Sequence, residues 1–176
     1  RFFMQRGSLD CFTTASCDEQ ELDDPSSAIF ALRPHLLIPL PFFRARQSSL
    51  DRQYNGSAWL AADGRHDTEF LAGSCSTTGR ARRASWWSGE LPRTGPAPEV
   101  VAVRVLGRSD CCWERLDGWQ VRVGEDPNPW KNPPCGPPQR RSERGGSWRE
   151  VHCGRGMPGR FVGVVMPGPS PLTLCE

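Results

Sequence analysis

Residues 108–115 carry the residue types best suited to recognising a ligand. Their sequence, Arg-Ser-Asp-Cys-Cys-Trp-Glu-Arg, places two arginines, an aspartate and two adjacent cysteines in one loop-sized segment. The preceding residues 101–105, Val-Ala-Val-Arg-Val, alternate in polarity, which predicts a half-buried strand. Continued alternation would put Arg108 and Asp110 on one face. There the carboxylate can fix the guanidinium group as a bidentate partner and leave its other donors free.

The adjacent pair Cys111 and Cys112 allows two interpretations. Successive Cα atoms lie about 3.8 Å apart, whereas ordinary disulfides need roughly 4.4 to 6.8 Å. The two cysteines can therefore bond to each other only through a strained ring, which would form a rigid apolar projection. Alternatively, they face opposite ways along a strand and pair with distant cysteines.

Length and composition predict one globular unit. A chain of 176 residues can bury a core, and its 18 glycines and 17 prolines indicate many tight turns. Lys131 is the only lysine among 22 basic residues, and the net charge is only +2. Arginines scattered among acids, without a lysine-rich run, argue against a nucleic-acid partner.

Eight cysteines without zinc-like spacing indicate an oxidising compartment, so we expect a secreted, extracellular protein. No apolar run reaches the ~20 residues that cross a bilayer, which predicts no membrane insertion. No signal peptide opens the chain, which starts at Arg1 as a fragment or a mature form would. The tripeptide Asn55-Gly56-Ser57 is a candidate glycosylation sequence, although Asn-Gly is also a turn signal.

Short apolar runs separated by turn clusters predict an all-β sandwich or barrel after residue 44. The expected strands cover residues 57–62, 86–91, 99–106, 119–123, 159–166 and 172–176. Of Trp86 and Trp87, one ring should point inward and the other outward. Residues 126–146 read as a long proline-rich surface loop clamped by Cys135 and Cys153.

Residues 1–43 do not resemble the rest of the chain and are expected to form an irregular N-terminal extension. Cys11 and Cys17 flank a polar segment and are more suited to pairing with each other than with the main domain. Three prolines within residues 34–43 disfavour a regular helix or strand there.

Residues 44–176 resemble the F-type lectins, fucose-binding domains with a jelly-roll fold. The shared landmarks, in chain order, are residues 47–49, 62–64, 70 with 73–75, 86–87, 108–115, 118 with 121–124, 159–162 and 172–176. The resemblance implies an all-β jelly-roll β-sandwich, galactose-binding-domain-like. It also implies a final strand cut short, because the chain ends at Glu176.

The resemblance further implies three disulfides and a sugar site. The implied bonds are Cys111–Cys112, Cys135–Cys153 and Cys75–Cys175. Arg108 and Arg115 match the family's sugar donors, Asp110 would orient them, and the bonded Cys111 and Cys112 would lie against an apolar edge of the sugar. Charged donors suit the oxygens of a neutral sugar, and the methyl group of fucose suits a polarizable flank.

Two positions depart from the family pattern. A histidine that contributes to the family's sugar site is matched by Thr77, whose hydroxyl can supply a weaker bond. An aromatic residue common after the landmark phenylalanine is Leu71 here. Loss of one side-chain hydrogen bond costs about 1–3 kcal/mol, or roughly 5- to 150-fold in affinity.

The family also binds a structural Ca²⁺ ion, for which the resemblance implies six residues. They are side chains of Asp63, Ser74 and Glu176 and main-chain carbonyls of Leu60, Arg65 and Cys175. Calcium takes six to eight oxygen ligands, and a carbonyl serves whatever its side chain.

We therefore expect a secreted, calcium-stabilised lectin that binds terminal L-fucose on fucosylated glycans and is not an enzyme. No nucleophile, histidine triad or metal cluster accompanies its carboxylates. Homo-oligomers or tandem lectin domains would raise a weak single-site affinity. The alternative is a degenerate sandwich that lost fucose binding and acts as an adhesion or structural module.

Overall fold

The computed structural model describes residues 3–6, 37–80, 84–93, 95–140 and 145–176. The expected pairing of Cys11 with Cys17 lies outside these residues. Antiparallel strands and four short 3-10 helices make up the regular structure of the described part. No helix in this part combines the length and the apolar character that a bilayer crossing requires.

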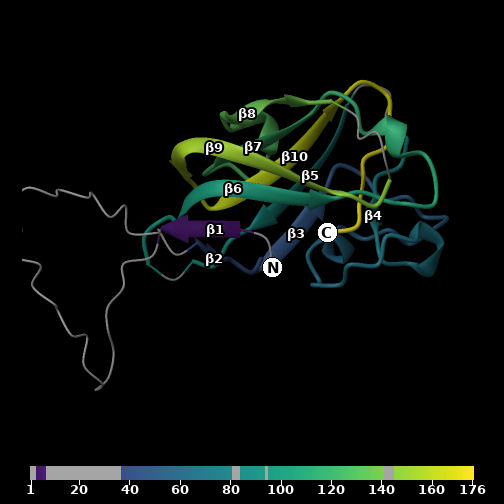
Figure 1. Cartoon of the computed structure of the whole chain (residues 1–176), viewed down its shortest axis with the longest axis horizontal. Helices are drawn as coiled ribbons and strands as arrows, with labels where there is room; N and C mark the ends of the chain where they lie inside the picture. The colour runs from purple at the N-terminus through teal and green to yellow at the C-terminus, as the bar shows by residue number, and fades with distance from the viewer. Residues whose placement is uncertain (1–2, 7–36, 81–83, 94, 141–144) are drawn as a thin grey trace, which may run out of the picture.

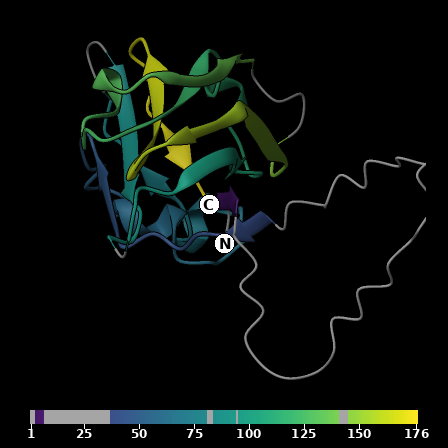
Figure 2. The same cartoon turned by 90° about the vertical axis from the view of Figure 1, so that its left-hand side faces the viewer.

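Two antiparallel sheets face each other as the layers of a sandwich (Figures 1 and 2). The five-stranded sheet contains, in spatial order, β3 (Arg44–Gln47), β5 (Ala84–Glu90), β10 (Phe161–Pro167), β7 (Trp119–Gly124) and β8 (Pro134–Gln139). The four-stranded sheet contains β2 (Leu37–Pro39), β1 (Phe3–Arg6), β6 (Glu99–Leu106) and β9 (Trp148–Pro158). A third pair joins β4 (Ser76–Thr77) to β11 (Thr173–Leu174). The predicted all-β jelly-roll sandwich is confirmed.

Alternating apolar residues fill the space between the sheets. Val103 and Val105 of β6 and Val162 and Val164 of β10 are at most 4% exposed and belong to one buried cluster. Trp87 joins this cluster, whereas Trp86 is half-buried on the opposite face of β5, as alternation predicts. The buried Trp87 indole donates to the carbonyl of Ala58 at 2.8 Å, so its polar atom is satisfied.

Two strand predictions and one loop prediction need correction. Residues 57–62 form the 3-10 helix η1 (Ala58–Ala61), because the turn at Gly56 leads directly into i to i+3 hydrogen bonds. The segment 172–176 contributes only the two residues of β11. Residues 126–146 are not simply a loop, since they contain η4 (Pro129–Lys131) and β8. Prolines are tolerated in β8 because it is an edge strand.

The strand β9 was not predicted, because its sequence mixes charged residues and glycines with few apolar ones. Only Val151 and Cys153 of β9 are deeply buried. The predicted Cys135–Cys153 bond is present and joins β8 to β9, so it ties the edges of the two sheets together.

Two short strands form within residues 1–43, where the sequence predicts an irregular segment. β1 pairs with β6 on one side and with β2 on the other. Because β2 is an edge strand, Pro39 can lie at its end without removing a hydrogen bond from the interior of the sheet.

Candidate functional site

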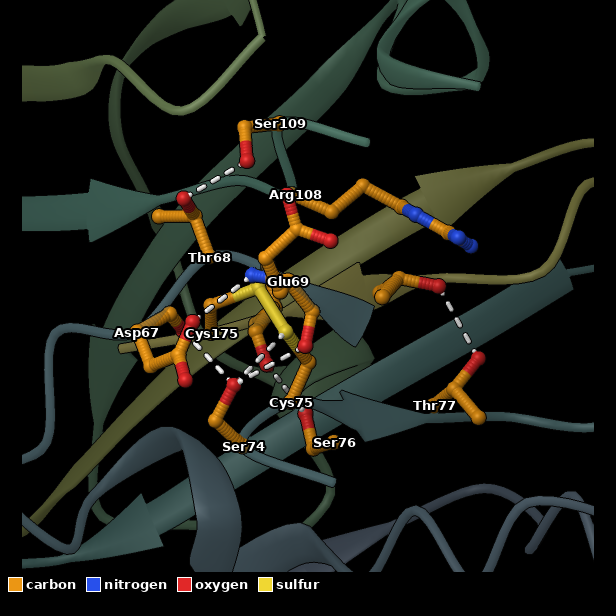
Figure 3. Close-up of a disulfide and its surroundings, with 12 residues drawn as sticks. Asp67, Thr68, Glu69, Ser74, Cys75, Ser76, Thr77, Arg108, Ser109 and Cys175 are labelled. Atoms are coloured by element: carbon orange, nitrogen blue, oxygen red, sulfur yellow. Dashed lines mark hydrogen bonds between the residues drawn. A yellow bond between two sulfur atoms is a disulfide. The ribbon is translucent and has the colours of Figure 1, made fainter. Parts of the chain in front are cut away.

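The loop that joins β6 to β7 is fixed at its start by neighbouring main chain. Leu106 exchanges hydrogen bonds with the C-terminal residues Cys175 and Glu176. Ser109 N donates to the carbonyl of Thr68 at 2.9 Å, and the Thr68 hydroxyl donates to the Ser109 hydroxyl at 2.7 Å (Figure 3). The base of residues 108–115 is therefore held before any ligand arrives.

A glycine pair lets another segment approach this loop closely. Gly146 N donates to the carbonyl of Arg108 at 3.0 Å. A Cβ atom on Gly145 would lie 2.9 Å from that carbonyl and 2.8 Å from the Trp113 ring. Both distances are too short for a real Cβ atom, so residue 145 must lack a side chain for this approach.

Arg108 and Asp110 form a two-point ion pair. Arg108 Nε donates to Asp110 Oδ1 at 2.7 Å and Nη2 donates to Oδ2 at 2.6 Å. The two side chains are only 11% and 18% exposed. The predicted bidentate geometry is present, but it forms within a loop, because β6 ends at Leu106.

The Arg108 guanidinium also lies 4.1 Å from the centre of the Phe70 ring. Phe70 is 7% exposed and meets the edge of the Tyr54 ring at 5.0 Å between centroids. A cation over an aromatic face is attracted by the ring's negative face. Phe70 and Asp110 together fix the position of the Arg108 head group.

Leu71, which follows this buried phenylalanine, is 77% exposed. It lies in the 3-10 helix η2 (Phe70–Ala72), in which Phe70 is the buried residue. The structure therefore gives Leu71 no packing role among the described residues.

Cys111 and Cys112 are bonded to each other, so the alternative that they pair with distant cysteines is wrong. The main chain makes this bond possible through a left-handed conformation at Cys112, where φ is 62°. Few non-glycine residues adopt this conformation, and they do so mainly where the surroundings impose it. The Cys75–Cys175 bond is also present, as the family resemblance implied.

Arg115 completes the site from the 3-10 helix η3 (Trp113–Arg115). Its side chain is exposed and has no polar partner among the described residues. One small hollow brings together residues from the loop and from the C-terminal segment: Arg108, Cys112, Trp113, Arg115, Leu116, Pro171 and Thr173. Arg108 and Arg115 thus border the same space as Cys112 of the vicinal disulfide.

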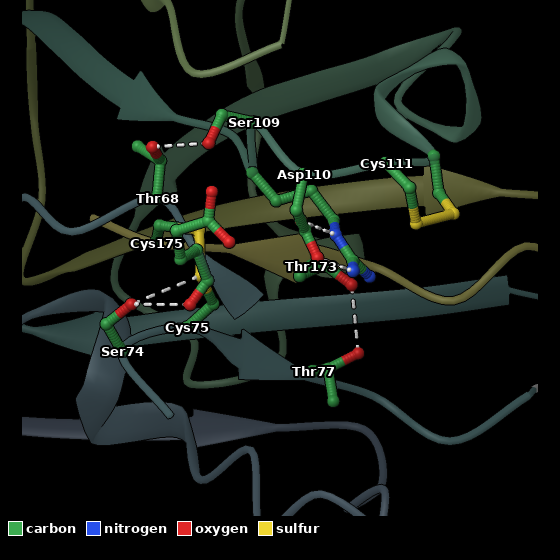
Figure 4. A network of polar contacts seen from close by, with 12 residues as sticks. Thr68, Ser74, Cys75, Thr77, Ser109, Asp110, Cys111, Thr173 and Cys175 are labelled. Carbon is green, nitrogen blue, oxygen red and sulfur yellow. Dashed lines mark hydrogen bonds and ion pairs between the residues drawn. A yellow bond between two sulfur atoms is a disulfide. The ribbon is translucent and has the colours of Figure 1, made fainter. Parts of the chain in front are cut away.

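Thr77 is not among the residues that line the hollow. It is 4% exposed, and its hydroxyl lies 2.9 Å from that of Thr173 (Figure 4). Thr173, the residue opposite Thr77 in the β4–β11 pair, lines the hollow instead. Thr173 belongs to the family landmark at residues 172–176, which could have marked it as a candidate. The sequence does not show that this segment pairs with β4, so Thr173 could not be placed at the site.

Three of the expected calcium ligands, Ser74, Cys175 and Glu176, belong to or directly flank the Cys75–Cys175 bond. Ser74 is fully buried, and its hydroxyl donates to the carbonyls of Asp67 at 2.7 Å and Glu69 at 3.4 Å (Figure 3). Glu176 is 7% exposed and accepts from Gly64 N at 3.3 Å.

Burial raises the pKa of Glu176; the hydrogen bond from Gly64 N opposes this shift, and the Asp63 carboxylate adds a smaller contribution in the same direction as burial. No group of three or more His, Cys, Asp or Glu side chains in the described residues could hold a metal. A cation would therefore depend on hydroxyl and carbonyl oxygens beside these two carboxylates. An all-oxygen set fits Ca²⁺ rather than a softer metal.

A larger cavity of about 220 Å³ lies between the sheets and away from residues 108–115. Its lining is mostly apolar, including Phe42, Trp87 and Leu174, with Asp63, Arg104 and Glu176 among the polar residues. Such a lining suits an apolar ligand better than a polyhydroxylated one. The smaller hollow is therefore the better candidate for a sugar site.

The pH dependence of the Arg108–Asp110 pair follows from its geometry. The hydrogen bonds from Arg108 lower the pKa of Asp110 below its ordinary value of 3.8, although burial opposes them. The stabilisation is therefore present above pH 3.8 and is lost only as the pH falls through the lower folded-state pKa. We expect the Asp110 carboxyl carbon, followed by NMR, to titrate below pH 3.8. In Arg108→Ala this pKa should rise, and an unchanged value would contradict the pairing.

Comparison with known proteins extends these observations. A scan against models of known protein families gave no match. Fucolectin-1 of Anguilla japonica is 35% identical over 119 residues, which cover 66% of this chain and 64% of that protein. Fucolectin of Anguilla anguilla is 33% identical over 125 residues, which cover 69% of this chain and 75% of that protein.

A solved structure is similar as well. The f-lectin (fucolectin) from serum of the striped bass, Morone saxatilis, matches with a TM-score of 0.67 and 32% identity, over 76% of this chain and 44% of that one. The chain thus spans just under two thirds of Fucolectin-1 and less than half of the striped bass protein.

The jelly-roll fold and the loop site at its end define a domain of the lectin class. The chain belongs to the F-type lectin, or fucolectin, family.

Proposed function

We propose that this protein is a secreted lectin that binds terminal L-fucose on glycans and performs no catalysis. The observation that carries the proposal is the hollow shared by Arg108, Arg115 and Cys112. The names of the relatives, fucolectins from two eels and from striped bass serum, point to the same sugar.

Arg108 supplies directed donors to the sugar. A guanidinium group carries five N–H bonds, of which Asp110 takes one from Nε and one from Nη2. The remaining N–H bonds of Arg108 are available to sugar hydroxyls. Asp110 holds their direction, so the ligand does not have to order the arginine on binding.

Arg115 and the vicinal disulfide complete the recognition. Arg115 is exposed, and it donates to the ring oxygen or a hydroxyl from the other side of the hollow. The sulfurs of Cys111 and Cys112 offer a polarizable surface to the apolar edge of fucose, which a methyl group enlarges. Thr173 adds a hydroxyl supported by Thr77, in place of the family's histidine.

Three formed disulfides support secretion, because reducing compartments keep thiols reduced. One small site binds a single sugar weakly, so we expect homo-oligomers or tandem lectin domains to supply avidity on cell-surface glycans.

The proposed function is tested by titrating the refolded protein with L-fucose in a calorimeter, beside Arg115→Ala. Arg115 is exposed and has no polar partner in the described part of the chain, so its removal should leave the fold intact. L-fucose binding should weaken by roughly 10-fold or more, as the loss of charged hydrogen bonds does. L-galactose, which carries a hydroxyl on the methyl carbon of fucose, should bind more weakly. Equal affinities for the two proteins would place the sugar away from Arg115, whereas no binding of either L-fucose or fucosylated glycans would favour the degenerate adhesion module.

We also propose that Ca²⁺ stabilises the fold through side chains of Asp63, Ser74 and Glu176, together with the carbonyls of Leu60, Arg65 and Cys175. The buried Glu176 carboxylate near Asp63 supports this proposal, since a cation there would offset their repulsion. The same segment fixes the base of the sugar-binding loop through Leu106.

Calcium removal gives a measurable outcome. At a calcium concentration about 100 times its dissociation constant, the free energy of unfolding should rise by about 2.7 kcal/mol. Scanning calorimetry with calcium or with chelator measures this difference. Asp63→Asn should lose most of the calcium response. A transition temperature that does not depend on calcium would refute the calcium site and leave the sugar site untouched.

A further inference from the structure

The turn at residues 55–57 precedes η1 and lies on the surface. Asn55 and Ser57 are exposed, and neither side chain has a polar partner among the described residues. Ser57 occupies the N-cap position of η1, but its hydroxyl does not cap the helix. The two outer residues of Asn55-Gly56-Ser57 thus present their polar groups to solvent.

Packing explains why residue 56 is glycine, but it does not explain why residues 55 and 57 are asparagine and serine. Gly56 is buried, and its carbonyl accepts from Thr77 N at 2.9 Å and from Gln47 Nε2 at 3.0 Å. A Cβ atom there would lie 2.5 Å from Cγ2 of Thr77. Asn55 has φ of 51°, which asparagine tolerates but glycine would adopt more easily. Among the residues that the structure describes, the Ser57 hydroxyl makes no hydrogen bond that the fold would need.

We propose that Asn55 carries an N-linked oligosaccharide. Asn-Gly-Ser is an acceptor sequence for this modification in proteins that enter the secretory pathway, so the inference rests on the proposed secretion. The chain has only two other asparagines, Asn128 and Asn132, and each is followed by proline and by no acceptor hydroxyl. Asn55 is therefore the single acceptor in this sequence.

The modification is a glycosyl transfer from a lipid-pyrophosphate-linked oligosaccharide. The side-chain amide nitrogen of Asn55 forms a bond to the anomeric carbon and gives up one proton. The bond between that carbon and the pyrophosphate oxygen breaks, and the lipid pyrophosphate leaves with the bonding electrons. The Ser57 hydroxyl belongs to the recognised acceptor sequence and remains unmodified.

The acceptor residue is connected to the candidate sugar site through two ring contacts. Asn55 follows Tyr54, whose ring contacts Phe70, and the Arg108 guanidinium lies over the same phenylalanine.

The test is secretion of the full chain from cultured animal cells behind a cleavable leader, followed by mass spectrometry. The intact mass should exceed that of the polypeptide and should fall when an amidase removes N-glycans. Amidase treatment in heavy-oxygen water should convert Asn55 to labelled aspartate in the tryptic peptide 53–65.

Matched variants identify the acceptor. Asn55→Gln and Ser57→Ala should both lack the added mass, whereas Ser57→Thr should retain it. Ser49→Ala, which changes an exposed serine outside the acceptor sequence, should be modified like the wild type. Secreted protein with unmodified Asn55 would overturn the inference. L-fucose titration of the same samples reports on the proposed function independently, since sugar binding does not require Asn55.

Discussion

Replacing Cys75 and Cys175 together with alanine should lower the free energy of unfolding by about 4–5 kcal/mol. The two cysteines are 100 residues apart in sequence, and the chain-entropy model assigns about 4.7 kcal/mol to a loop of that length. Both residues are at most 1% exposed, so the lost sulfurs also remove packing. Denaturant unfolding monitored by tryptophan fluorescence measures the change.

The matched control is the double replacement of Cys111 and Cys112 with alanine. This pair closes no loop of intervening chain, so the unfolding midpoint should stay close to that of the wild type. Its sugar binding should weaken, because the polarizable flank of the site is lost. If the two double variants lost equal stability, the long-range bond would not be the main covalent constraint on the fold.

The second large effect is expected for Arg108→Ala. This variant loses charge-assisted hydrogen bonds to the sugar, each worth about 1.5–3 kcal/mol. Two such bonds correspond to a loss of roughly 100-fold or more in L-fucose affinity. The same change leaves the Asp110 carboxylate without the two hydrogen bonds that Arg108 donates to it.

Arg155→Ala provides the control for this prediction. Arg155 is an exposed arginine of β9. Trp148, at the start of β9, pairs with Leu106 near the site, and Arg155 lies seven residues further along the strand. Calorimetric titration of both variants with L-fucose should show a large loss only for Arg108→Ala. Circular dichroism checks that each variant is folded. Equal affinities would place the sugar outside the hollow.

The roles of the three disulfides differ although all six cysteines belong to one domain. Cys75–Cys175 joins the segment before β4 to the C-terminal end, and Cys135–Cys153 joins the two sheets. Both are buried. The Cys111–Cys112 pair is only half-buried, and Cys112 borders the hollow. We therefore expect the first two bonds to stabilise the fold and propose that the third forms part of the sugar-binding surface.

The sequence by itself determined the fold class, the strand at residues 99–106 and the Arg108–Asp110 pair. Alternation of apolar residues is a local signal with a period of two, and the burial of β6 follows it except near a register shift between Val100 and Ala102 and at the end of the strand. The arginine and aspartate are two residues apart, so their pairing also needs only local chain. The linkage of Cys75 to Cys175 came from family resemblance, because spacing alone does not specify disulfide connectivity.

The tertiary structure alone decided which distant residues complete the site. Thr173 reaches the hollow because β11 pairs with β4, and Phe70 lies under Arg108 because η2 packs beside the β6–β7 loop. β8 and β9 were missed for a similar reason, since prolines and charges are tolerated at sheet edges. Contacts between residues far apart in sequence depend on how the layers pack, and no local pattern in the chain encodes that packing.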